Sequence, residues 1–103
     1  GLYGFVRGAT ISRELLAPAL AAASRHLAGN REPVIDGFRA QDGIIVEGYE
    51  GILSAGRIEP RPFEIVFETP ADAPLERQVQ AAVAALGAIL QRYRAMLSVA
   101  NDI

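Results

Sequence analysis

The sequence has 103 residues, half of them hydrophobic and about a fifth charged, with a formal net charge of -2. A chain of this length and composition is expected to fold as a single α+β domain spanning residues 1–103, which excludes a disordered chain. The absence of cysteine excludes disulfides and thiolate metal sites, and the negative net charge argues against nucleic acid as a partner.

Several features of the sequence concern its origin rather than its fold. All ten cations are Arg and Ala occurs 18 times, which indicates the codon bias of a GC-rich, bacterial genome. The first residue is Gly1 rather than Met, which indicates either a processed chain or one that begins at a domain boundary. The longest apolar runs, 15–23 and 81–90, are shorter than the roughly 20 residues of a membrane span. We therefore predict no membrane association; the compartment stays open, with the cytoplasm favoured.

The first predicted elements are a short strand and a helix. The alternation of large residues with glycine in this opening segment predicts a short strand over residues 2–7, with Tyr3, Phe5 and Arg7 on one side. A helix is expected to begin after Thr10 or Ser12 and to run to about residue 28. Pro18 either kinks this helix or marks the first turn of a helix that begins near residue 17. Its apolar stripe is Leu16, Leu20, Ala23 and Leu27.

Three strands are predicted next, as an antiparallel meander. Asp42-Gly43 is typical of a tight hairpin turn, which would join strands over residues 34–40 and 44–53. Pro60 and Pro62 delay the third strand, which then places Phe63, Ile65 and Phe67 toward the core. A long helix over residues 73–99 follows. The expected order is β-α-β-β-β-α, an antiparallel sheet with two helices packed on one face.

The strongest pattern in the chain lies in this last helix. Its apolar residues recur at spacings of four, three, four, three, four and three, which is a heptad-like seam of Val79, Val83, Leu86, Leu90, Tyr93, Leu97 and Ala100. The helix is roughly 40 Å long, whereas a strand spans only about 17–20 Å. We therefore expect it to overhang the sheet, so that its distal part, residues 89–100, exposes a contiguous apolar surface, unless this end folds back under the first helix or strand. The predicted interface residues are Val83, Leu86, Ile89, Leu90, Tyr93, Met96 and Leu97.

The segment GILSAGRI, residues 51–58, resembles the beginning of a phosphate-binding loop but lacks its chemistry. Gly51 and Gly56 have the spacing of the motif, yet Arg57 replaces its Lys and Ile58 replaces the hydroxyl that holds magnesium. The segment also leads into a proline and a strand instead of opening a helix. We interpret it as a structural glycine turn and predict no cofactor.

Two weaker groups of polar residues are candidates for a ligand site. Asp36, Glu47 and Tyr49 share a side of the predicted hairpin and would form a small polar cluster, although surface-facing strand residues are the commoner explanation. His26 is the single histidine and has no second His or Cys as a metal partner, so its simplest role is to interact with a helix C-terminus. We predict neither a catalytic residue nor a metal site.

The segment QRYR, residues 91–94, raises a third, nucleic-acid interpretation. Arg92 and Arg94 flank Tyr93, so stacking and phosphate contact are conceivable, but Tyr93 falls on the apolar stripe of the helix. The sequence therefore favours a non-catalytic, self-associating domain that acts as an assembly or adaptor module, as a homo-oligomer or with a protein partner. The alternative is a small-ligand-binding or enzymatic domain with a pocket between the sheet and the helices.

Overall fold

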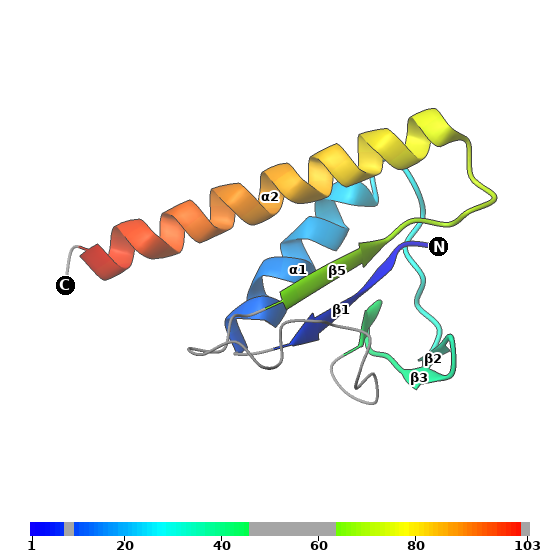
Figure 1. The fold of residues 1–103 in the computed structure, drawn as a ribbon, viewed down its shortest axis with the longest axis horizontal. Coiled ribbons are helices and arrows are strands. Elements are labelled where there is room, and N and C mark those ends of the chain that lie inside the picture. Colours follow the sequence, from blue (N-terminus) through cyan, green and yellow to red (C-terminus); the bar gives the residue numbers. More distant parts are fainter. Residues whose placement is uncertain (8–9, 46–63, 102–103) are drawn as a thin grey trace.

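The computed structural model describes residues 1–7, 10–45 and 64–101 and confirms the α+β class (Figure 1). The two predicted helices are present, and the C-terminal one is the longer. The predicted strand residues beyond 45, with Glu47, Tyr49 and the glycine segment 51–58, lie outside the described residues. The elements in order are β1 (Tyr3–Arg7), α1 (Thr10–Ala23), β2 (Val34–Ile35), β3 (Phe38–Arg39), β4 (Ile44–Ile45), β5 (Glu64–Glu68) and α2 (Leu75–Asn101).

Among the described residues, the main sheet has three strands in the order β4-β1-β5 and is mixed rather than wholly antiparallel. β1 pairs antiparallel with β5 over its full length, from Tyr3 opposite Glu68 to Arg7 opposite Glu64. β4 runs parallel to β1, with Gly4 opposite Ile44. The short strands β2 and β3 form a separate antiparallel hairpin.

Two Asp-Gly turns explain why the sheet differs from the predicted meander. Asp42 and Gly43 have φ angles of 51° and 80°, and the backbone groups of Gln41 and Ile44 exchange hydrogen bonds across them, so this turn is confirmed. Asp36 and Gly37 adopt the same conformation, with φ angles of 51° and 83°. This second turn folds the predicted strand 34–40 in half, into β2 and β3. The chain then enters β4 beside β1 instead of pairing with β3.

α1 covers one face of the sheet and ends earlier than predicted. It continues through Pro18, so regular helix does not begin at residue 17, and it ends at Ala23 rather than at residue 28. After a turn over residues 24–27, the chain forms backbone hydrogen bonds with Leu2. The Leu2 amide donates to the Ala28 carbonyl at 2.9 Å, and the Asn30 amide donates to the Leu2 carbonyl at 2.8 Å.

Gly4 of β1 allows α1 to approach the sheet closely. A Cβ atom at this position would lie 2.6 Å from the Val66 carbonyl oxygen and 2.9 Å from Leu16 Cδ2. No side chain fits there without moving the neighbouring strand or the helix, so glycine is required at this contact. Leu16, which is fully buried, takes the space above Gly4.

The sheet separates two apolar clusters. The helical side contains the buried residues Leu2, Val6, Leu16, Ala19, Ala23, Ile44, Ala81 and Ala85. The opposite side contains Phe5, Ile35 and Ile45, with Tyr3, Phe38, Ala40 and Val66 half-buried around them. The predicted alternation of β1 is confirmed for Tyr3 and Phe5 against Leu2 and Val6. Both helices therefore lie on one face, and the β2–β3 hairpin covers the other.

Candidate interaction surface

α2 packs onto the rest of the chain through small residues. Ala81 and Ala85 are 0% and 2% exposed and belong to the same cluster as Ala19 and Ala23 of α1. Alanines on both helices let the two axes approach closely, because no long side chain separates them. α2 therefore buries a narrow, alanine-lined face.

Gln78 fixes which face of α2 points inward. Its side-chain amide donates to the Ala73 carbonyl at 2.8 Å, and its side-chain oxygen accepts a hydrogen bond from the Thr69 hydroxyl at 2.9 Å. Gln78 is three residues before Ala81, so both lie on the same side of the helix. These bonds tie the beginning of α2 to the end of β5 and orient the helix about its axis.

The opposite face of α2 presents large apolar side chains to solvent. Their exposed fractions range from 46% to 66%, and the residues are Val79, Val83, Leu86, Leu90 and Leu97. At about 3.6 residues per turn they form one line along the helix, on the side away from Ala81 and Ala85. Together with Tyr93, which is half-buried, we call this line the α2 seam. The side chain of Ala100 lies outside the described residues.

The end of α2 extends beyond the sheet, as its length predicts. The helix has 27 residues, or roughly 40 Å, and the longest dimension of the molecule is 44 Å. Figure 1 shows its C-terminal turns, in orange and red, projecting past α1 and β5. The distal half of the α2 seam therefore lies on a part of the helix that this chain's described elements do not cover.

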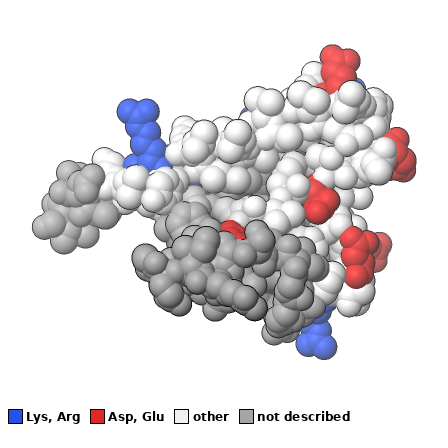
Figure 2. All heavy atoms as spheres, in the orientation of Figure 1, with Lys and Arg blue, Asp and Glu red and all other residues white. Residues whose placement is uncertain are grey.

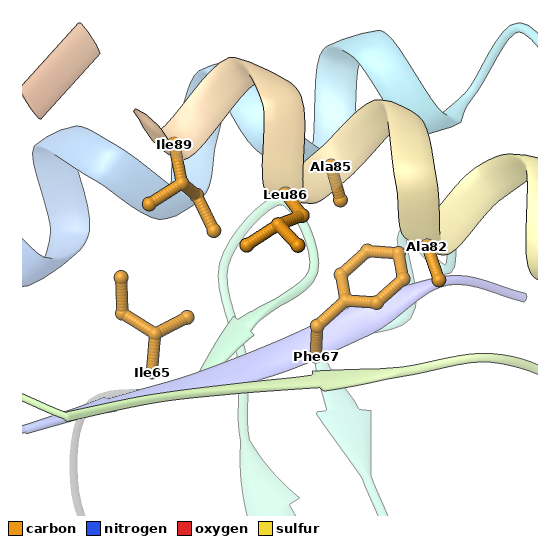
Figure 3. A pocket seen from close by; sticks show the side chains of 6 residues that line it. All are labelled: Ile65, Phe67, Ala82, Ala85, Leu86 and Ile89. Atoms are coloured by element: carbon orange, nitrogen blue, oxygen red, sulfur yellow. The ribbon is translucent and has the colours of Figure 1, made fainter. Parts of the chain in front are cut away.

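A groove lies beside the α2 seam, between α2 and β5. Its volume is about 370 Å³, and it is lined by Ile65, Phe67, Ala82, Ala85, Leu86 and Ile89. Figure 3 shows Ile65 and Phe67 rising from β5 toward Leu86 and Ile89 of the helix. Leu86 belongs to both the groove and the seam, so the two form one continuous apolar surface.

Along α2, charged side chains flank this surface at the two ends of the helix. Residues 78–91 contain no charged side chain, whereas Glu76 and Arg77 precede them and Arg92 and Arg94 follow. In Figure 2 uncharged surface covers the middle of α2, with acidic side chains where the helix begins and a basic one toward its distal end. Such a surface, apolar at its centre and polar at its rim, is typical of a protein interface.

The predicted interface residues differ in how far they are exposed. Val83, Leu86, Leu90 and Leu97 are exposed, whereas the remaining residues are half-buried, namely Ile89, Tyr93 and Met96. Ile89 also packs on the core beneath the helices. The set therefore consists of an exposed line and a half-buried flank.

Asp36, predicted as a ligand-site residue, contacts Tyr3. The Tyr3 hydroxyl donates a hydrogen bond to Asp36 Oδ2. This bond, followed by burial and by the charges of Asp36 and Glu68, raises the pKa of Tyr3 from 10.0 to about 12. Tyr3, Phe5 and Phe38 stack edge to face, with ring centroids 5.9 Å and 5.6 Å apart. Asp36 thus helps to hold the β2–β3 hairpin against β1.

His26, the other described member of the predicted ligand set, lies elsewhere. It follows α1, where its amide donates to the Ala23 carbonyl at 2.9 Å and its carbonyl accepts from Arg77 at 3.4 Å. α1 and the β2–β3 hairpin cover opposite faces of the sheet, so His26 and Asp36 do not share a pocket. Within the described ranges, no group of three or more His, Asp or Glu side chains is placed to hold a metal ion.

The arginines that suggested nucleic-acid contact are separated from any larger basic surface on α2. Arg92 and Arg94 are exposed near the distal end of the helix, and the remaining α2 cation is Arg77 near its beginning. Affinity for phosphates rises with the number of cations that contact them. Two arginines on a chain of net charge -2 supply few such contacts.

Two features of the surface were not identified from the sequence. The lining of the groove was not predicted, because the pocket suggested between the sheet and the helices was assigned polar residues, whereas the groove joins apolar residues of β5 and α2 that are distant in the chain. The inward role of Ala81 and Ala85 was also missed, although alanines four residues apart in both helices, at 19 and 23 and at 81 and 85, are a visible signal.

No helix in the part of the chain that the structure describes is long and apolar enough to cross a membrane. Comparison of the chain with protein-family models, with curated proteins and with solved structures found no match.

Proposed function

We propose that this chain is a self-associating assembly module that pairs through the α2 seam. One observation carries the proposal: α2 turns Ala81 and Ala85 inward and its Val and Leu side chains outward. Contiguous apolar surface of this kind usually marks a contact with a partner. A heptad-like line of Val and Leu is also the pattern by which helices pack against other helices.

The size of the exposed surface sets the expected strength of association. Fully burying a Val or Leu side chain contributes about 1.5–3 kcal/mol. The five exposed seam residues are about half exposed, so covering them in both copies contributes on the order of 10 kcal/mol. Association costs about 4–15 kcal/mol in lost freedom of motion. These five residues alone therefore support weak pairing, and the groove and the half-buried flank determine whether it becomes tight.

Light scattering after size exclusion, over a series of protein concentrations, tests the proposal. We expect the parent chain to form dimers or larger assemblies and Leu90→Glu/Leu97→Glu to remain a folded monomer, because two carboxylates would lie in the apolar contact. Gln91→Glu/Ala95→Glu is the matched control, since it adds the same charges to exposed positions away from the seam. A parent chain that is monomeric at every concentration contradicts the proposal, as does a control that dissociates equally.

The groove supports a second candidate function, the binding of a small apolar ligand. Its volume of about 370 Å³ lies within the range of ligand sites, and all six lining residues are apolar. An environment-sensitive dye, anilinonaphthalene sulfonate, is a suitable probe. Under this function the dye fluoresces with the parent chain and much less with Ala82→Phe, which fills the groove. Equal fluorescence from both proteins counts against the groove as a ligand site.

A further inference from the structure

We propose that two copies of this chain pair through antiparallel α2 helices in a register centred on residue 88. In this register Leu86 of one copy faces Leu90 of the other. The inference deepens the proposed function and rests on it. Its occupant is a second copy of the chain, for reasons of spacing, side-chain size, charge and the position of the overhang.

The spacing of the α2 seam reads the same in both directions. From Val79 to Leu97 the steps are four, three, four, three and four. An antiparallel partner centred on residue 88 therefore places every seam residue opposite another seam residue. The facing positions are 79 with 97, 83 with 93, and 86 with 90.

The sizes of the facing side chains also favour this register. Val79 faces Leu97, and Val83 faces Tyr93, so each smaller side chain meets a larger one. A parallel pair would instead place Val on Val and Tyr on Tyr. Facing layers that combine small and large residues fill the space between two helices more evenly.

The charges at the ends of α2 favour antiparallel pairing as well. In a parallel pair, the two copies of Arg94, which borders the seam, would lie at the same height along the paired helices. In the antiparallel register they are separated by roughly 18 Å along the axis. This distance exceeds the screening length of about 8 Å at physiological ionic strength. The repulsion that a parallel pair would bring is thereby removed.

Only the antiparallel arrangement brings the overhang of one copy to the groove edge of the other. The distal turns of α2 project beyond the sheet, whereas the groove lies beside its proximal half (Figures 1 and 3). Antiparallel pairing lays the overhang of one copy along Val79 and Val83 of the other, next to Ala82 at the groove edge. Parallel pairing stacks one overhang on the other and leaves both grooves open.

Disulfide cross-linking between single-cysteine variants tests the register, because the chain contains no cysteine of its own. Val79→Cys and Leu97→Cys, one of them tagged for size, are oxidised separately and as a mixture. We expect the mixture to give several-fold more mixed disulfide than either variant gives with itself, because a disulfide forms only where Cβ atoms come within about 4.5 Å. Ala95→Cys, on another face of α2, is the control and is expected to stay reduced.

Three outcomes contradict the inference, and they separate it from the proposed function. Strong self-linking of Val79→Cys and Leu97→Cys, each alone, indicates a parallel pair. A dominant product between Val79→Cys and Leu90→Cys indicates a register shifted by one heptad. In both cases light scattering under reducing conditions still shows a dimer, so the proposed function survives. A monomer under those conditions contradicts the inference and the proposed function together.

Discussion

The inner face of α2 packs against α1 through Ala81 and Ala85, whereas its outer face presents Val83, Leu86 and Leu90 to solvent. If the helix were placed only to bury its largest apolar side chains within the chain, the two faces would be exchanged. The close approach of α1 and α2 requires small side chains, so the larger ones are left outside. The packing of α2 within the chain therefore uses its small residues, and under the proposed function the outer Val and Leu side chains make a contact with a second copy.

The largest expected effect comes from truncating a leucine beneath the inner face of α2, compared with the same truncation on its outer face. Leu16→Ala removes a fully buried side chain from the cluster beneath the inner face and is expected to cost about 2–5 kcal/mol of unfolding free energy. Leu90→Ala, at a half-exposed seam position, is expected to cost less than about 1 kcal/mol in the monomer. Urea denaturation at concentrations where light scattering gives a monomer measures both. Equal costs would show that the seam belongs to the core of a single chain.

Enlarging one side chain on each face of α2 is expected to give the next largest difference in stability. Ala85→Leu adds volume where α1 and α2 meet and is expected to destabilise the chain by about 1–3 kcal/mol. Val83→Leu adds a single methylene group on the outer face and is expected to change stability by less than about 0.5 kcal/mol. The two midpoints in urea, measured at the same low protein concentration, provide the comparison. If Ala85→Leu left the stability unchanged, close packing of α1 against α2 would not require a small side chain at residue 85.

Periodicity in the sequence predicted the position of the α2 seam but not which side of the helix faces the core. The spacing of Val79, Val83, Leu86 and Leu90 requires only that these residues share a face. The inward face follows from contacts with α1 and from the hydrogen bonds of Gln78, and neither is visible in a periodic pattern. The overhang was predictable because it depends on helix length alone.

The β-strands were harder to predict because their pairing is not local. Asp36-Gly37 carries the same turn signal as Asp42-Gly43, and reading residues 34–40 as one strand overlooked it. The parallel pairing of β4 with β1 joins segments about 40 residues apart, and no sequence pattern specifies that partner. Asp36 of the predicted polar cluster contacts Tyr3, whereas Glu47 and Tyr49, the other members of that cluster, lie outside the described residues.

The smallest expected effect concerns the other side of the sheet, where the hydrogen bond between Tyr3 and Asp36 helps to hold the β2–β3 hairpin. The pKa of Tyr3 is about 12 in the folded chain against an ordinary 10.0. The folded state therefore binds this proton more tightly, and the associated stability is fully present below pH 10.0 and is lost as the pH rises toward about 12. The chain has no Lys whose titration would overlap this window.

Replacing Tyr3 isolates this contribution, because the variant and the parent chain share every other side chain. We expect Tyr3→Phe to lose less stability than the parent chain between pH 10.0 and about 12, because it has no proton to release. Near neutral pH it is expected to be less stable by up to about 1 kcal/mol, through the lost hydrogen bond to Asp36. Thermal unfolding across the window measures both effects. Parallel losses in the two proteins would show that Tyr3 does not anchor the hairpin. An unchanged assembly state in Tyr3→Phe would show that the hairpin side and the outer face of α2 act independently.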